Sequence, residues 1–279
     1  MRYSAKQKVA ISVNYVILIF AALIAIVPLL VVFLGSFKST VEFNSTGVLK
    51  LPQNWFYFEN YIRAFTEGRM LLGFMNTIII LFFSIIATVM TGAMVAYILS
   101  RFEFKFKKLV VSAFLTASLI PGITMQISVF QIISALGLFN NRLSLIILFA
   151  GTDIISIYIF MQFFKNIPYS IDESAIIDGA SYFTIFFKTL LPLLKPAMIT
   201  VIISKGVGFY NEFYMPFLYM PRPDLAVIST ALFRFQGPYG ALWEVICAGV
   251  IITIIPALVI FILLQKHIYN GLTSGAVKE

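Results

Sequence analysis

The chain has 279 residues, of which 60% are hydrophobic and 11% are charged, against roughly 25% charged residues in an average soluble domain. A water-soluble fold of this length could not bury so much apolar surface, which excludes an ordinary soluble enzyme or binding protein. The net charge of +8 would suit nucleic acid, but the basic residues lie between apolar runs. The sequence therefore predicts a protein whose solvent is the lipid bilayer.

Long apolar runs recur along the chain, and about 20 such residues form a helix that crosses the ~30 Å hydrocarbon core. Four runs lack Asp, Glu, Lys and Arg; two more carry isolated ionisable residues, Asp153 in one and Lys205 and Glu212 in the other. We expect an all-α integral membrane protein that forms a single transmembrane domain over residues 1–279. The expected spans are 11–36, 70–99, 108–136, 143–164, 194–219 and 243–265.

Lysine and arginine collect on one side of these spans, as they do in cytoplasmic loops. The residues on that side are Arg2, Lys6, Lys8, Arg101, Lys105, Lys107, Lys108, Lys165, Lys188, Lys195, Lys266 and Lys278. Both termini and the loop 165–193 are therefore expected in the cytoplasm, with 38–69 and 221–242 outside. The first span is too long for the apolar core of a signal peptide, so we expect it to be retained.

Helix-breaking residues occur within the apolar runs at Pro28, Pro121 and Pro256. Prolines are tolerated in membrane helices where neighbouring groups satisfy the freed carbonyls. Gly122 follows Pro121 and weakens the third span further. The sequence leaves open whether this span has a packed kink or a true break.

Catalytic chemistry is missing from the pattern. The chain has no G-x-x-x-x-G-K-[ST] phosphate loop, so it is not expected to hydrolyse ATP by that route. Its one histidine, His267, lies at the inner end of the last span, where a basic residue suits the cytoplasmic interface. Its one cysteine, Cys247, lies within that apolar helix and is expected to pack there. We expect no metal or cofactor on this chain, no catalytic residue and no nucleic-acid partner.

The loop 165–193 predicts a short helix that starts near Ile171. Ser170 and Glu173 have the spacing of a capping box, in which each side chain bonds the other residue's amide. Asp172 and Glu173 in the first turn complement the positive end of the helix dipole. Gly179 is a natural stop, because glycine adopts the left-handed conformation that ends many helices.

A second helix is expected over 180–190, ending before Pro192. The first helix carries apolar residues on several faces, which indicates burial against protein. A plug that docks on a soluble partner and a helix that lies on lipid both remain open. Asp178 and the acids of the first turn disfavour the lipid, since the inner leaflet repels acids.

Glu173-Ser-Ala-x-x-x-Gly179, followed after nine residues by Thr189-Leu-Leu-Pro192, resembles the E-A-A-x-x-x-G-x(9)-I-x-L-P signature of ABC importer permeases. The resemblance implies a type I permease architecture in which this loop forms the coupling helix, seated in a cleft of an ATP-binding subunit. The residues it assigns to coupling are Asp172, Glu173, Ala175, Asp178 and Gly179.

Further stretches resemble the six-span permease of maltose-type carbohydrate importers. These are Ala96-Tyr97-x-x-Ser100-Arg101-Phe102, Tyr210-Asn-Glu-Phe213, Phe235-Gln-Gly-x-Tyr-Gly240 and the tail 271–278. The resemblance implies a bacterial plasma-membrane heterodimer of this chain with a second permease. It also implies two ATP-binding subunits, which carry ATP and Mg, and an extracytoplasmic sugar-binding protein. Membrane lipids surround this chain.

Lys205 and Glu212 are seven residues apart, so on one continuous helix they would share a face about 10.5 Å apart along the axis. Charges inside a bilayer usually face a cavity or a partner. The sequence predicts a substrate pathway along Lys205, Gly208, Tyr210, Asn211 and Glu212; separate satisfaction of the two charges at helix contacts is equally open. Lys205 departs from the family's usual uncharged residue, which leaves both a neutral and an acidic sugar open.

The resulting hypothesis is a permease subunit of an ATP-driven sugar importer that works by alternating access. The alternative is a self-sufficient ion-coupled carrier, with Asp153, Lys205 and Glu212 as its ion sites. Carriers often contain inverted repeats with broken helices, and no repeat is visible here. A membrane-embedded enzyme is disfavoured by the missing catalytic clusters.

Overall fold

The computed structural model describes residues 5–151, 153–237 and 240–273. These residues are almost entirely helical, with one two-stranded hairpin, which confirms the predicted all-α class. Three predictions concern residues outside this set: the cytoplasmic location of Met1 and Glu279, the end of the family-like tail at 274–279, and Tyr239. Contacts group the chain into two compact units, Met1–Met70 with Leu232–Pro256 and Leu71–Ala231 with Ala257–Glu279.

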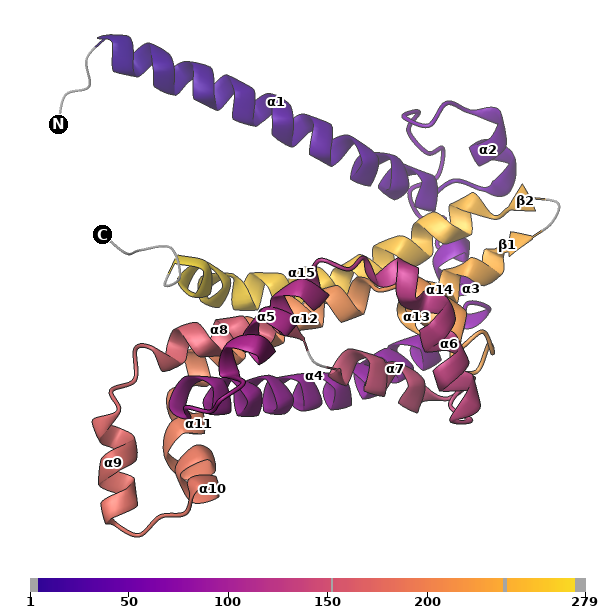
Figure 1. The fold of residues 1–279 in the computed structure, drawn as a ribbon. Coiled ribbons are helices and arrows are strands. Elements are labelled where there is room, and N and C mark those ends of the chain that lie inside the picture. The colour runs from indigo at the N-terminus through magenta and orange to yellow at the C-terminus, as the bar shows by residue number, and fades with distance from the viewer. Residues whose placement is uncertain (1–4, 152, 238–239, 274–279) are drawn as a thin grey trace. The chain divides into compact units, whose positions relative to one another are not determined.

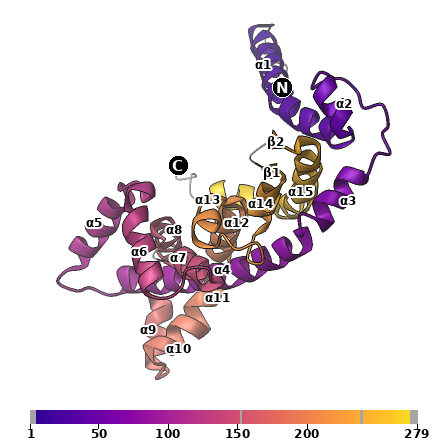
Figure 2. The ribbon, with the colours of Figure 1, turned by 90° about the vertical axis from the view of Figure 1, so that its right-hand side faces the viewer.

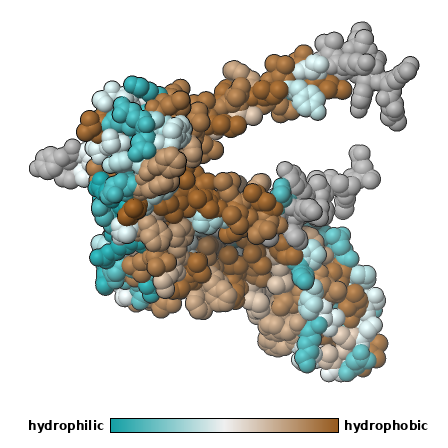
Figure 3. Space-filling model, turned by 180° about the vertical axis from the view of Figure 1, so that it is seen from behind, coloured by the Kyte–Doolittle hydropathy of each residue, from teal (hydrophilic) through white to brown (hydrophobic). Residues whose placement is uncertain are grey.

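The first unit contains one long apolar helix, α1, and no residue of its most apolar stretch is buried. Figure 3 shows the continuous apolar surface of this helix, and Figure 1 shows that only its last turns have neighbours within the unit. Asn60 closes that end by donating to the carbonyls of Ser36 and Lys38 at 2.9 and 2.8 Å. The unit's elements are α1 (Ala5–Ser36), α2 (Thr40–Ser45), α3 (Glu59–Thr66), η3 (Leu232–Phe235), β1 (Gln236–Gly237), β2 (Gly240–Ala241) and the first half of α15 (Trp243–Thr273).

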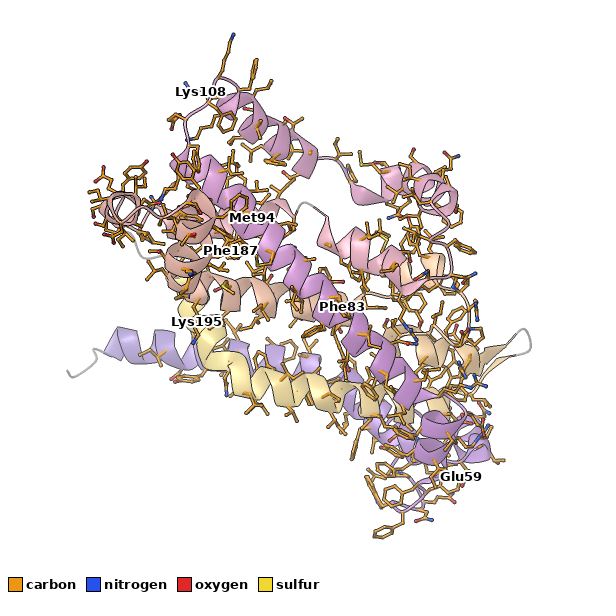
Figure 4. All side chains as sticks on the ribbon, turned by 90° about the horizontal axis from the view of Figure 1, so that it is seen from below. Glu59, Phe83, Met94, Lys108, Phe187 and Lys195 are labelled. Carbon is orange, nitrogen blue, oxygen red and sulfur yellow. The ribbon has the colours of Figure 1, made fainter. Side chains whose placement is uncertain are left out.

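The second unit is built around α4, from which Phe83 and Met94 project in Figure 4. Its largest buried cluster joins α4, α8, η2 and α12, and includes Ala93, Phe160 and Leu190. The elements are α4 (Met70–Arg101), α5 (Lys107–Ser118), η1 (Gly122–Met125), α6 (Gln126–Ala135), α7 (Arg142–Ala150), α8 (Ile154–Phe164), α9 (Ser170–Ile177), α10 (Tyr182–Thr184), the π-helical η2 (Ile185–Leu190), α11 (Leu191–Leu193), α12 (Lys195–Asn211), α13 (Tyr214–Tyr219), α14 (Ile228–Ala231) and the second half of α15.

Three helices are long and apolar enough to cross a membrane, and three bent helix pairs would bring the spans to six if each pair is one span. The third expected span is a true break, because α5 and η1–α6 meet at 94°. Pro121 lies at the corner in an extended conformation, as proline lacks an amide and disfavours helix in the residue before it. Pro28 and Pro256, in contrast, lie inside continuous helices.

The fourth and fifth expected spans are not continuous helices. α7 and α8 meet at 42° on either side of residues 151–153. The predicted helix over 194–219 is wrong: α12 ends at Asn211, Glu212 is extended, and α13 begins at Tyr214. The second loop helix also differs, since it passes Pro192 and continues to Leu193. A π-helical turn precedes the proline there, with the Leu191 amide bonded to the Phe186 carbonyl.

Candidate functional site

The loop between α8 and α12 forms a hairpin in which α9 and α10 lie side by side, as both ribbon views show (Figures 1 and 2). Gly179 makes the turn with φ of +78°, the left-handed conformation that the sequence predicts. The Ala180 amide donates to the Ala175 carbonyl at 3.0 Å and the Gly179 amide to the Ile176 carbonyl at 2.9 Å. These two bonds are the Schellman arrangement that satisfies the last carbonyls of a helix.

The start of α9 differs from the predicted capping box. Ser170 is already helical, and the Glu173 amide donates to the Tyr169 carbonyl at 3.1 Å. The Ile171 amide donates to the Pro168 carbonyl, so the backbone after proline begins the helix without help from the serine hydroxyl. The predicted helix exists, but its first turn is closed by carbonyls of residues 168–169.

Asp172 points into its own chain. Its Oδ2 lies 3.1 Å from Nη2 of Arg101, at the end of α4, and the two side chains are 5% and 9% exposed. The same Nη2 donates to the Ile167 carbonyl at 2.9 Å, and the guanidinium lies 5.6 Å from the ring centres of Phe164 and Tyr169. Arg101 therefore fixes α9 to the end of α4.

Burial raises the pKa of the Asp172 carboxyl, and the charge of Arg101 acts in the opposite direction. The other predicted coupling residues lie differently: Glu173, Asp178 and Gly179 are exposed and Ala175 is half-buried. Ile177 beside them is 84% exposed. The outer face of α9 thus combines acids with exposed apolar groups, a mixture visible in Figure 3.

A second polar cluster lies where the fourth apolar stretch is broken. Asp153 caps α8: its Oδ2 accepts from the Ser156 amide at 2.8 Å and also from the Ser156 hydroxyl. Its Oδ1 accepts from Nζ of Lys205, on α12, at 2.7 Å. Each side chain of this ion pair is 20% exposed, so the pair is neither in bulk solvent nor sealed from it.

The predicted stripe on α12 is only partly brought together. Glu212 lies beyond the helix end and its Oε1 accepts from the Met215 amide at 3.1 Å, so the shared face with Lys205 is not formed. The two charges are satisfied separately, one of the two readings left open by the sequence. Asn211 is exposed and donates to the Val207 carbonyl at 3.0 Å. A Cβ built at Gly208 would meet no described atom within 4 Å.

Another face of α12 borders an apolar cavity of about 230 Å³ with α4 and the second half of α15. Tyr210 and Asn211 provide its polar side chains; Leu81, Ile85 and Phe261 are among the apolar ones. Over the described residues, no three His, Cys, Asp or Glu side chains are grouped to hold a metal ion.

The sequence placed Arg101 in a basic loop and a family-like stretch, and Asp153 among the ion sites of the carrier alternative; it paired neither of them. Each lies far along the chain from its partner; Asp153 and Lys205 are 52 residues apart. No helical or strand period links such positions. The one usable signal is that a charge within an apolar run needs a partner, which points to Lys205 and Asp153 together.

Residues 88–274, which include the hairpin and both ion pairs, match the family of binding-protein-dependent transport system inner membrane components. The chain belongs to this family. It is 30% identical to the diacetylchitobiose uptake system permease protein of Streptomyces coelicolor, over 96% of this chain and 89% of that protein. It is also 30% identical to the arabinooligosaccharides transport system permease protein of Halalkalibacterium halodurans, over 93% of each.

The inner-membrane component shares its fold with a solved structure. A chain of a bacterial ABC transporter involved in the import of the acidic polysaccharide alginate superposes with a TM-score of 0.82 at 22% identity. The match covers 95% of this chain and 99% of that one. The superposition shows the shared fold, and the family match makes this chain a transport component of the bacterial inner membrane.

Proposed function

We propose that this chain is the permease subunit of a sugar importer driven by ATP hydrolysis on partner subunits. The names of similar proteins support a sugar, since they include uptake systems for diacetylchitobiose, arabinooligosaccharides and galactooligosaccharides. The missing phosphate loop supports hydrolysis elsewhere. In this proposal residues 1–279 form one permease domain with six spans, both termini lie in the cytoplasm, and 38–69 and 221–242 lie outside.

The observation that carries the proposal is the construction of the α9 hairpin. Its inner side is fixed by the buried pair of Arg101 and Asp172, and its turn at Gly179 is closed by two backbone bonds. Its outer side leaves Glu173, Asp178 and Gly179 for a partner, whereas Ala175 packs partly against the core of this chain. A rigid helix with an exposed apolar tip suits docking in a cleft of an ATP-binding subunit, since little order is lost on binding.

Coupling then follows from rigidity. Two ATP-binding subunits, which hold ATP and Mg, close on nucleotide, and α9 moves with them. Because Arg101 joins α9 to α4, the movement is passed to that span. With a second permease, the spans alternate between inward- and outward-open states, and sugar from an extracytoplasmic binding protein passes along α12. In this scheme Asp172 and Ala175 position the helix, and Glu173, Asp178 and Gly179 touch the partner.

Reconstitution in liposomes tests this function against the ion-coupled carrier. Candidate sugars are first screened for binding to the genetically linked binding protein, and uptake of the bound sugar is then measured. We expect uptake only with ATP, the ATP-binding subunits and the binding protein together. Uptake by this chain alone under a proton or sodium gradient would contradict the proposal.

A further inference from the structure

We infer that the transported sugar is uncharged where it passes α12, because the lysine in that helix is already neutralised by Asp153. The inference rests on the proposed function, since it concerns the substrate of the same pathway. Lys205 alone would indicate an acidic substrate. The 2.7 Å contact of its Nζ with Oδ1 of Asp153 removes that argument.

The side chain of Asp153 is surrounded by donors. Its two oxygens accept three hydrogen bonds, two from Ser156 and one from Lys205. Its position at the start of α8 also favours a negative charge, because a helix N-terminus carries a partial positive charge. The anion is thus held by the helix as well as by the lysine.

The pair lies where a substrate could meet it. Non-helical backbone within a membrane span is tolerated only inside protein or beside a water-filled cavity, and Gly151 and Asp153, between α7 and α8, are not helical. Both side chains remain 20% exposed. Gly208, three residues beyond Lys205, leaves its side of α12 open.

The other polar residues at this end of α12 add no positive charge. Asn211, on the face toward the apolar cavity, is neutral, and Glu212 follows the end of the helix. An anionic sugar would meet a compensated lysine and then a carboxylate. A neutral sugar would meet groups that form hydrogen bonds but exert no net electrostatic attraction or repulsion on it. It could therefore bind to and leave this part of the pathway easily.

Charge-specific variants test the inference, with uptake measured in proteoliposomes that contain the full transporter. Asp153→Asn keeps an oxygen that can cap Ser156 but leaves Lys205 uncompensated. Lys205→Gln does the reverse, and the double variant restores neutrality without either charge. Ser156→Ala is the matched control, because it removes one hydrogen bond of Asp153 and no charge.

For the neutral sugar that the wild type takes up, we expect at least a tenfold loss with Asp153→Asn and a smaller loss with Lys205→Gln. The double variant should return to within about threefold of wild type, and Ser156→Ala should stay near it. The opposite pattern overturns the inference: Asp153→Asn active, with Lys205→Gln and the double variant both inactive, would make Lys205 a substrate anion site.

A second measurement needs no variant and covers the case in which these fail to assemble. Wild-type transporter is supplied with diacetylchitobiose, arabino-oligosaccharides, galacto-oligosaccharides and alginate oligosaccharides. ATP-dependent uptake confined to neutral sugars supports the inference. Uptake of alginate oligosaccharides refutes it and leaves the proposed function standing, whereas uptake that needs no ATP refutes the proposed function itself.

Discussion

Two ion pairs in the second unit each join an aspartate to a basic residue far away in the sequence, and they differ in their surroundings. Arg101 and Asp172 are 9% and 5% exposed and are enclosed by aromatic rings and a backbone carbonyl. Lys205 and Asp153 are 20% exposed and lie beside a helix break. An arginine fork binds several planar partners at once, whereas a lysine is a point charge. The first pair therefore holds a helix in place, and the second, in the proposed function, cancels the lysine charge beside the path of the sugar.

The largest expected effect comes from breaking the enclosed pair. Arg101→Gln would leave the Asp172 carboxylate buried without its cation, a change that costs about 3–5 kcal/mol in other buried pairs. We expect α9 to lose its fixed position and the ATP-binding subunit to be lost on purification. Co-purification and limited proteolysis of 165–193 measure both consequences.

The double variant Arg101→Gln/Asp172→Asn is the control for that experiment. It removes the buried charge but also the contacts of Arg101 with Phe164, Tyr169 and Ile167, so we expect partial recovery. Full retention of the ATP-binding subunit in Arg101→Gln alone would show that the pair does not position α9.

A somewhat smaller effect is expected at the turn of the hairpin. Gly179→Asp places a Cβ in the left-handed region, at a cost of about 1–2 kcal/mol, and adds a charge beside the docking face. Gly137 offers a matched control: it also has positive φ, +69°, and ends α6 with the same pair of backbone bonds. Coupling of ATP hydrolysis to uptake should fall with Gly179→Asp and persist with Gly137→Asp. Equal behaviour of the two variants would remove the special role of Gly179.

The end of α12 sharpens the comparison on the side of the pathway. Glu212→Ala removes the acceptor of the Met215 amide, and a lost cap costs about 1 kcal/mol; Glu212→Gln keeps an acceptor without the charge. If the carboxylate serves only as a cap, uptake should fall with alanine and persist with glutamine.

Asn211→Ala should reduce uptake several-fold while the subunits still assemble. Normal uptake in Asn211→Ala would remove Asn211 from the pathway.

The smallest effect concerns pH. Because burial raises the pKa of Asp172, the folded state binds this proton more tightly than the unfolded state. The resulting stabilisation is complete below the ordinary value of 3.8 and is lost as pH rises through the raised pKa. Relative to Asp172→Asn, the wild-type complex should therefore gain thermal stability on acidification through that window. A difference that is flat with pH would contradict the burial of this carboxyl.

Sequence alone predicts much of this fold, because apolar length and loop charge report directly on membrane spans. It also predicts the helix at 170–177 and its stop at Gly179, which depend on neighbouring residues. It fails where distant residues decide the outcome. The continuous helix through Glu212 and the capping box at Ser170 are both wrong, since a helix break and the turn at Pro168 replace them. The partners of Asp172 and Lys205 are fixed by helix packing.

The central claim is that the outer face of α9 docks on an ATP-binding subunit in the cytoplasm. Ile177→Cys, in a Cys247→Ser background, places a thiol on that face at a side chain that is 84% exposed. Phe56→Cys, at a side chain that is 80% exposed in segment 38–69, is the control. With a thiol-to-amine crosslinker in native membranes, the account predicts a product with the ATP-binding subunit from residue 177 and none from residue 56. No product from residue 177, with labelling of that thiol from outside intact cells, would contradict it.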